Sequence, residues 1–376
     1  MNGSSLLHHL SLITDFRQSG KINHLLSDIL FLTVAAVIAG AEGWEEIEDF
    51  GHLRKEWLQG YGDFTNGIPS HDTIARVMSL INPKEFQKSF IQWMNECYVA
   101  TQGAVVCVDG KTLRRSYDKN RRTGAIHMVS AFSAANNVVL GQLKTEEKSN
   151  EIKAIPELLK LLDIHGCLVT IDAMGCQKDI AKTLIDRHAD YLFAVKDNQK
   201  RLKTALEEHF PMVSLVHYSG DHFSTQEKSH GREETRLHAV SKVPDSFVDF
   251  EMDWAKLKTL GVVVSFRTVD GKEPEEPSIR YYISSAELSA QQLANAVRQH
   301  WAIENKLHWI LDVAMREDEC RIRRGNAAET LAGVRHIALN LLKSNKTVKA
   351  GIKRKQKRAA MSSDYLDDVL TGAVAS

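Results

Sequence analysis

The sequence predicts an α/β protein in which a mixed β-sheet is covered by helices and preceded by a helical N-terminal domain. Two observations predict this fold class. Between residues 104 and 195, short apolar runs rich in β-branched residues alternate with segments of helical periodicity. The first 100 residues instead show helical spacing, with N-cap residues before the expected helices and glycine or proline after them.

The central region has the predicted order β-β-β-α-β-α-β. Three early strands followed by two alternating units favour a sheet that contains both antiparallel and parallel neighbours. The expected strands are residues 104–108, 124–134, 137–145, 167–171 and 191–195, and the expected helices are residues 149–163 and 177–188.

The N-terminal region, residues 1–100, is expected to form a helical domain. Its most apolar segment, residues 29–41, follows Ser27 and Asp28 as candidate N-caps. The segment is too short to span a bilayer, which indicates a buried helix. A further helix follows Ser70. This helix is a candidate for reading DNA, and ordinary packing is the alternative.

The rest of the chain divides into four parts. Residues 101–198 and 289–345 are expected to form the first part and the C-terminal helices of one core domain. Between them, residues 199–288 are predicted to be a β-rich insertion that begins with a charged helix. Residues 346–376 are polar and basic, and we expect them to form a flexible tail.

Composition excludes some classes of protein and leaves others open. Lysine plus arginine equal aspartate plus glutamate, 48 each, so net charge gives no indication of nucleic acid binding. The five cysteines are scattered without a CxxC pair, which argues against a disulfide framework and fits a reducing cytosol. The N-terminus lacks the pattern of a secretory signal. We therefore expect a cytoplasmic protein that has no membrane partner.

Two of the predicted strands end in aspartate. Asp109 follows the apolar run at residues 104–108, and Asp172 follows the run at residues 167–171. Strands of an α/β sheet place the next residue at the edge where ligands bind, so both carboxylates would face the same edge. Gly110 and residues 173–175 would let the chain turn sharply after them. A single aspartate of this kind is often only a cap or turn former, and the pair is more informative.

The third candidate acid is Glu304, within a helix expected at residues 289–315. A carboxylate on a mostly apolar helix face is costly unless it is paired or bound to a metal ion. A salt bridge to an arginine of another element is the alternative. Trp301 and Trp309 flank Glu304 and are expected to pack it in place. The residues that share its face at helical spacing are Val297, Trp301, His308 and Leu311.

Three acids that meet at a sheet edge suit Mg²⁺ or Mn²⁺, because these ions prefer oxygen ligands. Two such ions about 4 Å apart can serve both the attacking and the leaving oxygen of a phosphodiester. We therefore predict that Asp109, Asp172 and Glu304 are catalytic and hold two divalent ions. A transition-metal site on one helix is an alternative, because His300, Glu304 and His308 have i, i+4, i+8 spacing.

Several motifs extend the case beyond the three acids. The strand order and the acids resemble the RNase H-like core of DDE transposases from bacterial insertion sequences. Over nearly the whole chain, the sequence is similar to the H-repeat-associated transposases found beside Rhs elements. The motifs are specific together and not singly. They are Val108-Asp109-Gly110-Lys111, Lys148-Ser149-Asn150-Glu151, Thr170-Ile171-Asp172-Ala173, Val195-Lys196-Asp197-Asn198-Gln199, His230-Gly231-Arg232 and the block from Trp301 to Trp309.

The resemblance implies a metal-dependent transposase that cuts double-stranded DNA at transposon ends and joins the freed 3′-hydroxyl to target DNA. It implies a homodimer on DNA, since both ends must be held together, and a bacterial, nucleoid-associated location. It also implies that the β-rich insertion contacts the transposon ends or the partner subunit. The alternatives are an RNase H-like nuclease without strand transfer, a catalytically silent DNA-binding remnant, and a carboxylate-metal phosphatase.

One departure from related transposases concerns the residues around the catalytic glutamate. The relatives carry a tyrosine, an arginine, the glutamate and a lysine, where this chain has Val297, His300, Glu304 and Leu311. Only the glutamate matches, so the residues that would contact DNA phosphates must differ. The candidates for those contacts near Glu304 are Arg298, His300, Lys306 and His308.

A run of basic residues directly follows the first acid. Its position beside the expected site favours phosphate contacts over a solvated surface. Lys196 and Lys200 leave the last sheet strand in the same direction, and for them both interpretations stay open. Residues 353–358 either add non-specific DNA affinity or aid solubility. The basic residues after Asp109 are Lys111, Arg114, Arg115, Lys119, Arg121 and Arg122.

Overall fold

The computed structural model describes residues 3–98, 103–117, 125–145, 151–215, 218–229, 231–269 and 276–371. Over these residues a single mixed sheet has the strand order β3-β2-β1-β4-β5-β9-β8-β7-β6. Its strands are β1 (Val105–Thr112), β2 (His127–Ser133), β3 (Val138–Thr145), β4 (Leu168–Ile171), β5 (Asp190–Val195), β6 (His222–Ser229), β7 (Arg232–Lys242), β8 (Thr259–Val269) and β9 (Ser278–Ser284).

The connections between strands explain their directions. β1, β2 and β3 are joined by short links and pair antiparallel. β4 and β5 are reached through helices α7 (Glu151–Leu161) and α8 (Lys178–Asp186), and they run parallel to β1. A helical crossover is the usual way to join parallel strands. The predicted order β-β-β-α-β-α-β and the mixed sheet with flanking helices are therefore confirmed.

The β-rich region between residues 199 and 288 extends the same sheet. β9 pairs antiparallel with β5, and β8, β7 and β6 follow in order. β6 was not predicted, because its sequence HFSTQEKS is polar and lacks apolar alternation. The strand instead follows from its pairing with β7. Three helices accompany this region: α9 (Lys200–His209), α10 (Met212–Leu215) and α11 (Val248–Asp253).

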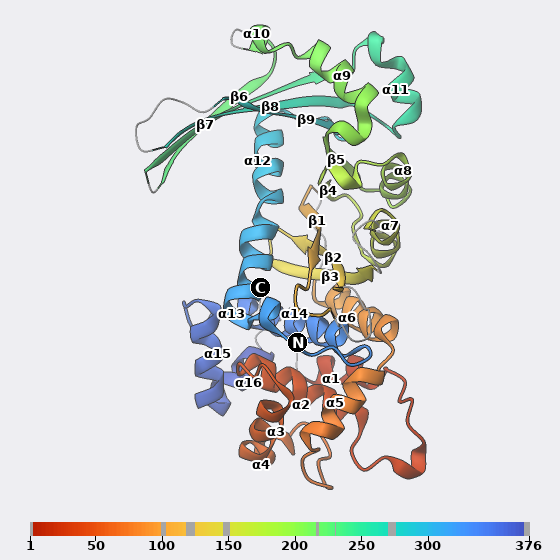
Figure 1. The fold of residues 1–376 in the computed structure, drawn as a ribbon, viewed down its shortest axis with the longest axis vertical. Helices are drawn as coiled ribbons and strands as arrows, with labels where there is room; N and C mark the ends of the chain where they lie inside the picture. Colours follow the sequence, from red (N-terminus) through yellow and green to blue (C-terminus); the bar gives the residue numbers. More distant parts are fainter. Residues whose placement is uncertain are drawn as a thin grey trace.

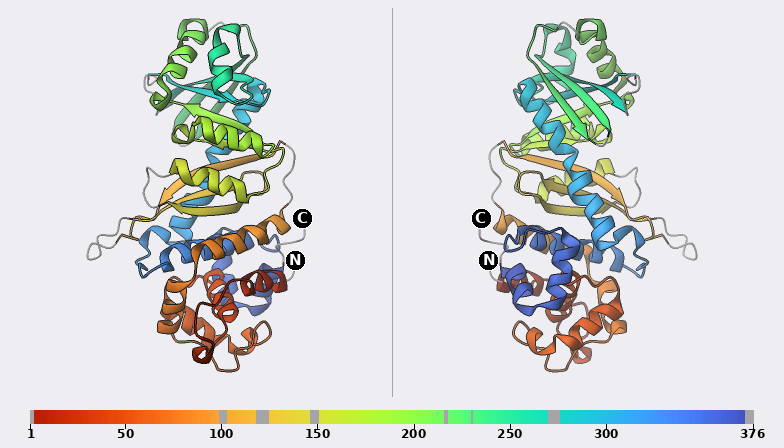
Figure 2. Two further views of the ribbon diagram at one scale, coloured as in Figure 1. Left: turned by 90° about the vertical axis from the view of Figure 1, so that its right-hand side faces the viewer. Right: turned by 90° about the vertical axis from the view of Figure 1, so that its left-hand side faces the viewer.

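Helices cover both faces of the sheet (Figure 1). Figure 2 shows α7 and α8 on one face and the long helix α12 (Ala290–His300) crossing the other. α12 begins with a capping box, in which the Ser289 side chain accepts from the Gln292 backbone and the Gln292 side chain accepts from the Ser289 backbone. Its buried face includes Leu293, Ala296 and Val297.

Helix α14 (Ala327–Ser344) joins the sheet to the N-terminal helices. It is buried along nearly its whole length and packs against β3 and α2 (Leu26–Ile38). α2 is itself buried almost throughout, as predicted for the apolar segment. No helix within the described residues is both long and apolar enough to cross a membrane. The other N-terminal helices are α1 (Gly3–Ser11), α3 (Trp44–Leu53), α4 (Lys55–Leu58), α5 (His71–Leu80) and α6 (Pro83–Cys97).

Side-chain caps fix the starts of two of the N-terminal helices, α5 and α6. Ser70 caps α5 by accepting from the Thr73 backbone, and Asn82 caps α6 by accepting from the Lys84 backbone. The expected cap of α2 differs, because the helix begins at Leu26, before Ser27 and Asp28. The Asp28 carboxylate accepts from the Phe64 backbone instead, so it ties the helix to a neighbouring loop.

The C-terminal segment also differs from the expected flexible tail. Its described part forms α15 (Ile352–Met361) and α16 (Ser363–Thr371), which pack beside α14 and α2. Leu366, Val369 and Leu370 are buried on one face of α16. The buried Lys355 ammonium donates to the Leu342 and Asn345 carbonyls at 2.7 Å each. These few apolar residues at helical spacing are enough to dock a segment whose overall composition is polar.

Candidate active site

Asp109 and Asp172 lie next to each other because their strands are parallel neighbours. Val108 of β1 stands opposite Ile171 of β4, and each aspartate is the next residue along its chain. β1 continues to Thr112 in its pairing with β2, so Gly110 does not begin the turn that we expected. A side chain at position 110 would instead collide with the buried side chains of His127 and Glu151.

Asp172 also caps the short 3₁₀ helix Ala173–Gly175. Its Oδ1 accepts from the Met174 backbone at 3.1 Å and from the Gly175 backbone at 3.3 Å. Both of these bonds end on one carboxylate oxygen, and Oδ2 takes no part in the cap. A capping role and a ligand role are therefore compatible in this residue.

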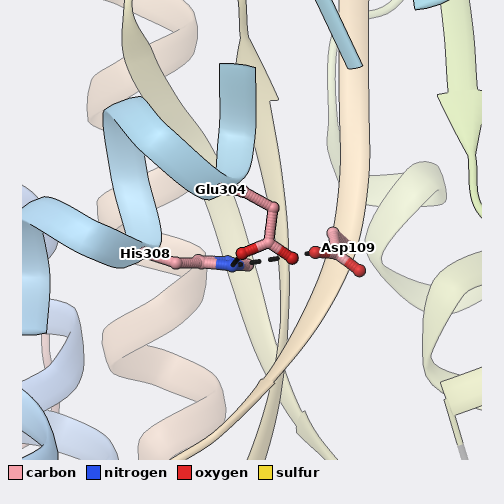
Figure 3. Close-up of side chains that lie close together, drawn as sticks. All are labelled: Asp109, Glu304 and His308. Atoms are coloured by element: carbon pink, nitrogen blue, oxygen red, sulfur yellow. Dashed lines mark ion pairs between the residues drawn. The ribbon is translucent and has the colours of Figure 1, made fainter. Parts of the chain in front are cut away.

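Glu304 reaches the same edge from the opposite side. α12 is followed by a π-helical turn, Glu304–His308, and then by α13 (Trp309–Met315). π-helical turns are rare and are often found at functional sites. The turn directs both Glu304 and His308 toward Asp109 (Figure 3). His308 Nδ1 lies 3.5 Å from Glu304 Oε2 and 3.7 Å from Asp109 Oδ2.

The three acids line one pocket of about 170 Å³. Two of these acids, Asp109 and Glu304, form a close group with His308, in which one possible ligand atom from each residue lies within 4.8 Å of the others. Asp172 lines the same pocket beside this group. His300 and Lys196 also line it. The spatial convergence on which the sequence interpretation depends is thus present.

Burial and mutual repulsion shape the charges of this pocket. Burial, with smaller contributions from the neighbouring Glu304 and Asp172, raises the pKa of Asp109 to about 6, against the opposing effect of His308. Interaction with the His308 ring holds the pKa of Glu304 below its usual value. Burial lowers the pKa of His300. The lining of the pocket has three acids and only two full cations, Lys196 and Arg280, among the described residues. This excess of negative charge suits a bound cation.

The comparison with known families bears on this arrangement. Residues 100–341 match the family profile described as "Transposase DDE domain", and residues 7–94 match one described as "DDE_Tnp_1-associated". The chain belongs to the DDE transposase family. In this DDE family member, the strand order β3-β2-β1-β4-β5, with acids on β1 and after β4, is the expected RNase H-like arrangement.

Close relatives of this DDE family member are bacterial. It is 60% identical over 371 residues to "Putative transposase YncI" of Escherichia coli O157:H7. The aligned region covers 98% of this chain and 95% of the relative. It is 56% identical over 375 residues to "H repeat-associated putative transposase YhhI" of Escherichia coli K12, with 99% of each chain covered. The predicted resemblance to H-repeat-associated transposases is confirmed.

A solved structure shows a weaker overall likeness. It is titled "Cryo-EM structure of piggyBac transposase synaptic complex with hairpin DNA (SNHP)" and is 12% identical, with a TM-score of 0.44. The match covers 97% of this chain and 77% of the other.

Lys111 has a different environment from the DNA-facing one that we expected in this transposase. Its ammonium contacts the Asp312 carboxylate and lies 2.8 Å from Glu317 Oε2, and its side chain is 11% exposed. It therefore joins β1 to α13 and to the short helix Glu317–Glu319. Sequence reasoning missed Asp312 and Glu317. Asp312 follows His308 by four residues, and this helical spacing could have indicated that the two side chains share one face.

The other basic residues that the sequence singled out lie in varied places. Arg114 is exposed and lies 3.2 Å from Asp318. Arg298 is exposed on α12 and forms an ion pair with Glu227 of β6. His300 Nδ1 lies 3.0 Å from Thr170 Oγ1. Arg115, Lys196 and Lys200 are exposed, and Lys119, Arg121 and Arg122 lie outside the described residues.

The two tryptophans do not pack Glu304 in place as expected. Trp301 is 46% exposed and Trp309 is 60% exposed. Arg280 of β9 stacks over the Trp301 ring, 4.9 Å from its centroid. The helical spacing used to assign one apolar face fails here, because α12 ends at His300 and the π-helical turn adds a residue per turn.

Lys343 of α14 supports the π-helical turn. Its Nζ donates to the Lys306 carbonyl and lies 5.0 Å from the centroid of the Phe132 ring. Burial, together with the charge of Lys306, lowers the pKa of Lys343 to about 7. The folded protein therefore favours the neutral amine, whereas the unfolded chain holds the proton up to about pH 10.4.

This shift predicts a pH-dependent stability. As pH falls from about 10.4 to 7, the unfolded state binds a proton that the folded state does not, so stability falls. In Lys343→Met, we expect the fall in the free energy of unfolding over this pH range to be smaller by on the order of 2 kcal/mol. The value is below that of a fully buried lysine, because Lys343 is only partly buried. Urea denaturation of both proteins at pH 7 and pH 9.5 measures it. Lys346→Met, at an exposed site, is the control. Equal pH slopes in all three proteins would contradict the prediction.

Proposed function

We propose that this chain is a metal-dependent transposase that cuts DNA strands at transposon ends and transfers the freed 3′-hydroxyl to target DNA. The observation that carries the proposal is the convergence of Asp109, Asp172 and Glu304 in one pocket at the edge of the sheet. Membership of the DDE transposase family supports the same reaction class. Beyond family membership, the cleavage and joining of DNA strands, the metal ions and the DNA contacts are proposals.

The residues of the pocket fit two Mg²⁺ or Mn²⁺ ions. Carboxylate oxygens are the ligands that these ions prefer. Asp109 is a partly buried acid whose ionised form is disfavoured by desolvation, and a nearby cation would offset that cost. When bound, such ions activate the attacking hydroxyl and neutralise charge on the leaving oxygen. Asp109 and Asp172 hold fixed positions on the sheet, and Glu304 supplies its carboxylate from the opposite side.

A groove beside the pocket supports a path for DNA. It has a volume of about 820 Å³, lies between α12 and the strands β6 to β9, and shares Arg280, Tyr282 and Trp301 with the pocket. Arginine and lysine outnumber acids along it. The cations are Arg236, Arg267, Arg280, Arg298 and Lys306, and the acids are Glu227, Glu234 and Glu276. We propose that the DNA backbone lies in this groove and that Lys196 and His300 contact phosphate at the pocket.

The salt dependence of DNA binding tests this path. Arg280→Gln is expected to weaken binding about fivefold and to lower the slope of log Kd against log salt by about one, because one phosphate contact is lost. Lys182→Gln, on α8 across the sheet, removes one exposed cation elsewhere and is expected to change neither value. Fluorescence anisotropy on a labelled duplex between 50 and 200 mM salt, roughly the range over which such contacts act, measures both. An unchanged slope in Arg280→Gln would exclude Arg280 from the path.

The assembly and location follow from the proposed reaction. We propose a homodimer on DNA, because the two transposon ends must be held together, and action at the nucleoid of a bacterial cytoplasm. Residues 1–100 and the insertion at residues 199–288 are the proposed contacts to transposon ends. The domain boundaries stay predictions.

A strand-transfer assay separates the proposal from its alternatives. Labelled duplexes from the DNA flanking the gene are incubated with the protein, Mg²⁺ or Mn²⁺ and a supercoiled plasmid. Cleaved ends joined to the plasmid are the expected products. Nicks without joining would favour an RNase H-like nuclease, and binding without cleavage would favour a silent remnant. Hydrolysis of p-nitrophenyl phosphate without DNA affinity would favour a phosphatase.

A further inference from the structure

His308 occupies a position that the proposed chemistry leaves without a role. Its side chain is 8% exposed, and it points from the π-helical turn at the carboxylates of Glu304 and Asp109 (Figure 3). In Figure 3 the Glu304 carboxylate lies between the imidazole ring and Asp109. A nitrogen of a buried side chain thus lies within 4.8 Å of a carboxylate oxygen from each of the two acids, as ligands of one ion would.

The distances around Nδ1 favour a shared ion over direct pairing. Nδ1 lies 3.5 Å from Glu304 Oε2 and 3.7 Å from Asp109 Oδ2. A hydrogen bond between an imidazolium and a carboxylate is shorter, at about 2.7–2.9 Å. Two ligands of one ion, with bonds of about 2.1 Å, lie between about 3.0 and 4.2 Å apart. Both observed separations fall within this interval.

We propose that His308 is a nitrogen ligand of one of the ions, so that the centre binds Mn²⁺ in preference to Mg²⁺. Mg²⁺ takes oxygen ligands almost entirely, whereas divalent first-row transition metals also accept an imidazole nitrogen beside oxygen ligands, with Mn²⁺ the weakest binder among them. Mn²⁺ belongs to that series and shares with Mg²⁺ the preference for carboxylate oxygens. This inference rests on the proposed function for Asp109 and Glu304 as the other ligands, and it adds the identity of the ion and its third ligand.

Electron spin-echo spectroscopy of bound Mn²⁺ tests the proposal directly. The full-length protein without DNA is loaded with Mn²⁺, and coupling to a ¹⁴N nucleus is measured. The wild-type protein is expected to show imidazole nitrogen coupling, and His308→Gln is expected to lose it and to bind Mn²⁺ about tenfold more weakly or worse. His300→Gln is the matched control, because His300 lines the same pocket while its Nδ1 lies 3.0 Å from Thr170 Oγ1.

A second variant keeps the test independent of folding defects. His308→Glu replaces the nitrogen ligand by a carboxylate, and the ratio of Mn²⁺ to Mg²⁺ affinity is expected to fall about tenfold. The inference would be overturned if nitrogen coupling persists in His308→Gln. It would also be overturned if the wild-type protein binds no Mn²⁺ or shows no nitrogen coupling. DNA cleavage by protein whose Mn²⁺ lacks nitrogen coupling would refute the inference alone. Coupling without any DNA product would refute the proposed function alone.

Discussion

Replacing Asp109 by asparagine is expected to lower the rate of DNA strand cleavage about 10³-fold or more. The amide removes a negative ligand that the sheet holds in place, and with it the stabilisation of the charged transition state, worth at least about 4 kcal/mol. Asp172→Asn and Glu304→Gln are expected to have the same effect, because each acid lines the same pocket. Cleavage of a labelled duplex at saturating metal measures the rate.

The loss is expected in catalysis and not in DNA binding. Basic residues along the groove contact phosphates in the proposal, so the Kd for a labelled duplex should stay within about threefold of the wild-type value. Asp197→Asn is the matched control, because Asp197 follows β5 at the same end of the sheet and its side chain is 80% exposed. Cleavage that persists in any of the three acid variants would remove that residue from the site.

Replacing Lys111 by methionine is expected to lower the free energy of unfolding by roughly 3–5 kcal/mol. The side chain of Glu317 is 2% exposed, and the variant would leave its carboxylate without the ammonium 2.8 Å away. An uncompensated buried charge is costly, whereas in the intact group the ammonium contacts both carboxylates. Urea denaturation at pH 7 measures the loss.

Two further variants test the cause. Lys153→Met, at an exposed position of α7, is expected to change the free energy of unfolding by less than about 0.5 kcal/mol. The triple variant Lys111→Met, Asp312→Asn, Glu317→Gln removes the ammonium together with the two carboxylates that it contacts, and it is expected to recover at least about half of the loss. If the triple variant is less stable than Lys111→Met, charge compensation is not the reason.

Much of the fold could be predicted from local patterns. The buried strands before Asp109 and Asp172 are continuous apolar runs, and such runs predict strands wherever they lie in the chain. The caps Ser70 and Asn82 bond to backbone groups within three residues, so their effect is also local. Because the two strands are parallel neighbours, the aspartates that follow Val108 and Ile171 then lie side by side.

Other features depend on partners far away in the sequence. Lys111 looks like part of a solvated basic run, and only Asp312 and Glu317, about 200 residues later, turn it inward. The buried face of α16 is formed by four residues, Tyr365, Leu366, Val369 and Leu370, within a polar segment. Trp301 and Trp309 are exposed because the helix changes from α to π geometry between them. Helical periodicity alone does not encode this change.

By itself, the sequence determined which acids are available, the strands that hold two of them and the family to which the chain belongs. Only the tertiary structure decided how Glu304 and His308 approach Asp109. The reason is physical: hydrophobic periodicity reports which face of an element is buried, and it carries no information about which polar groups meet across that face. That meeting depends on the crossing of α12 over the sheet and on the π-helical turn that follows it.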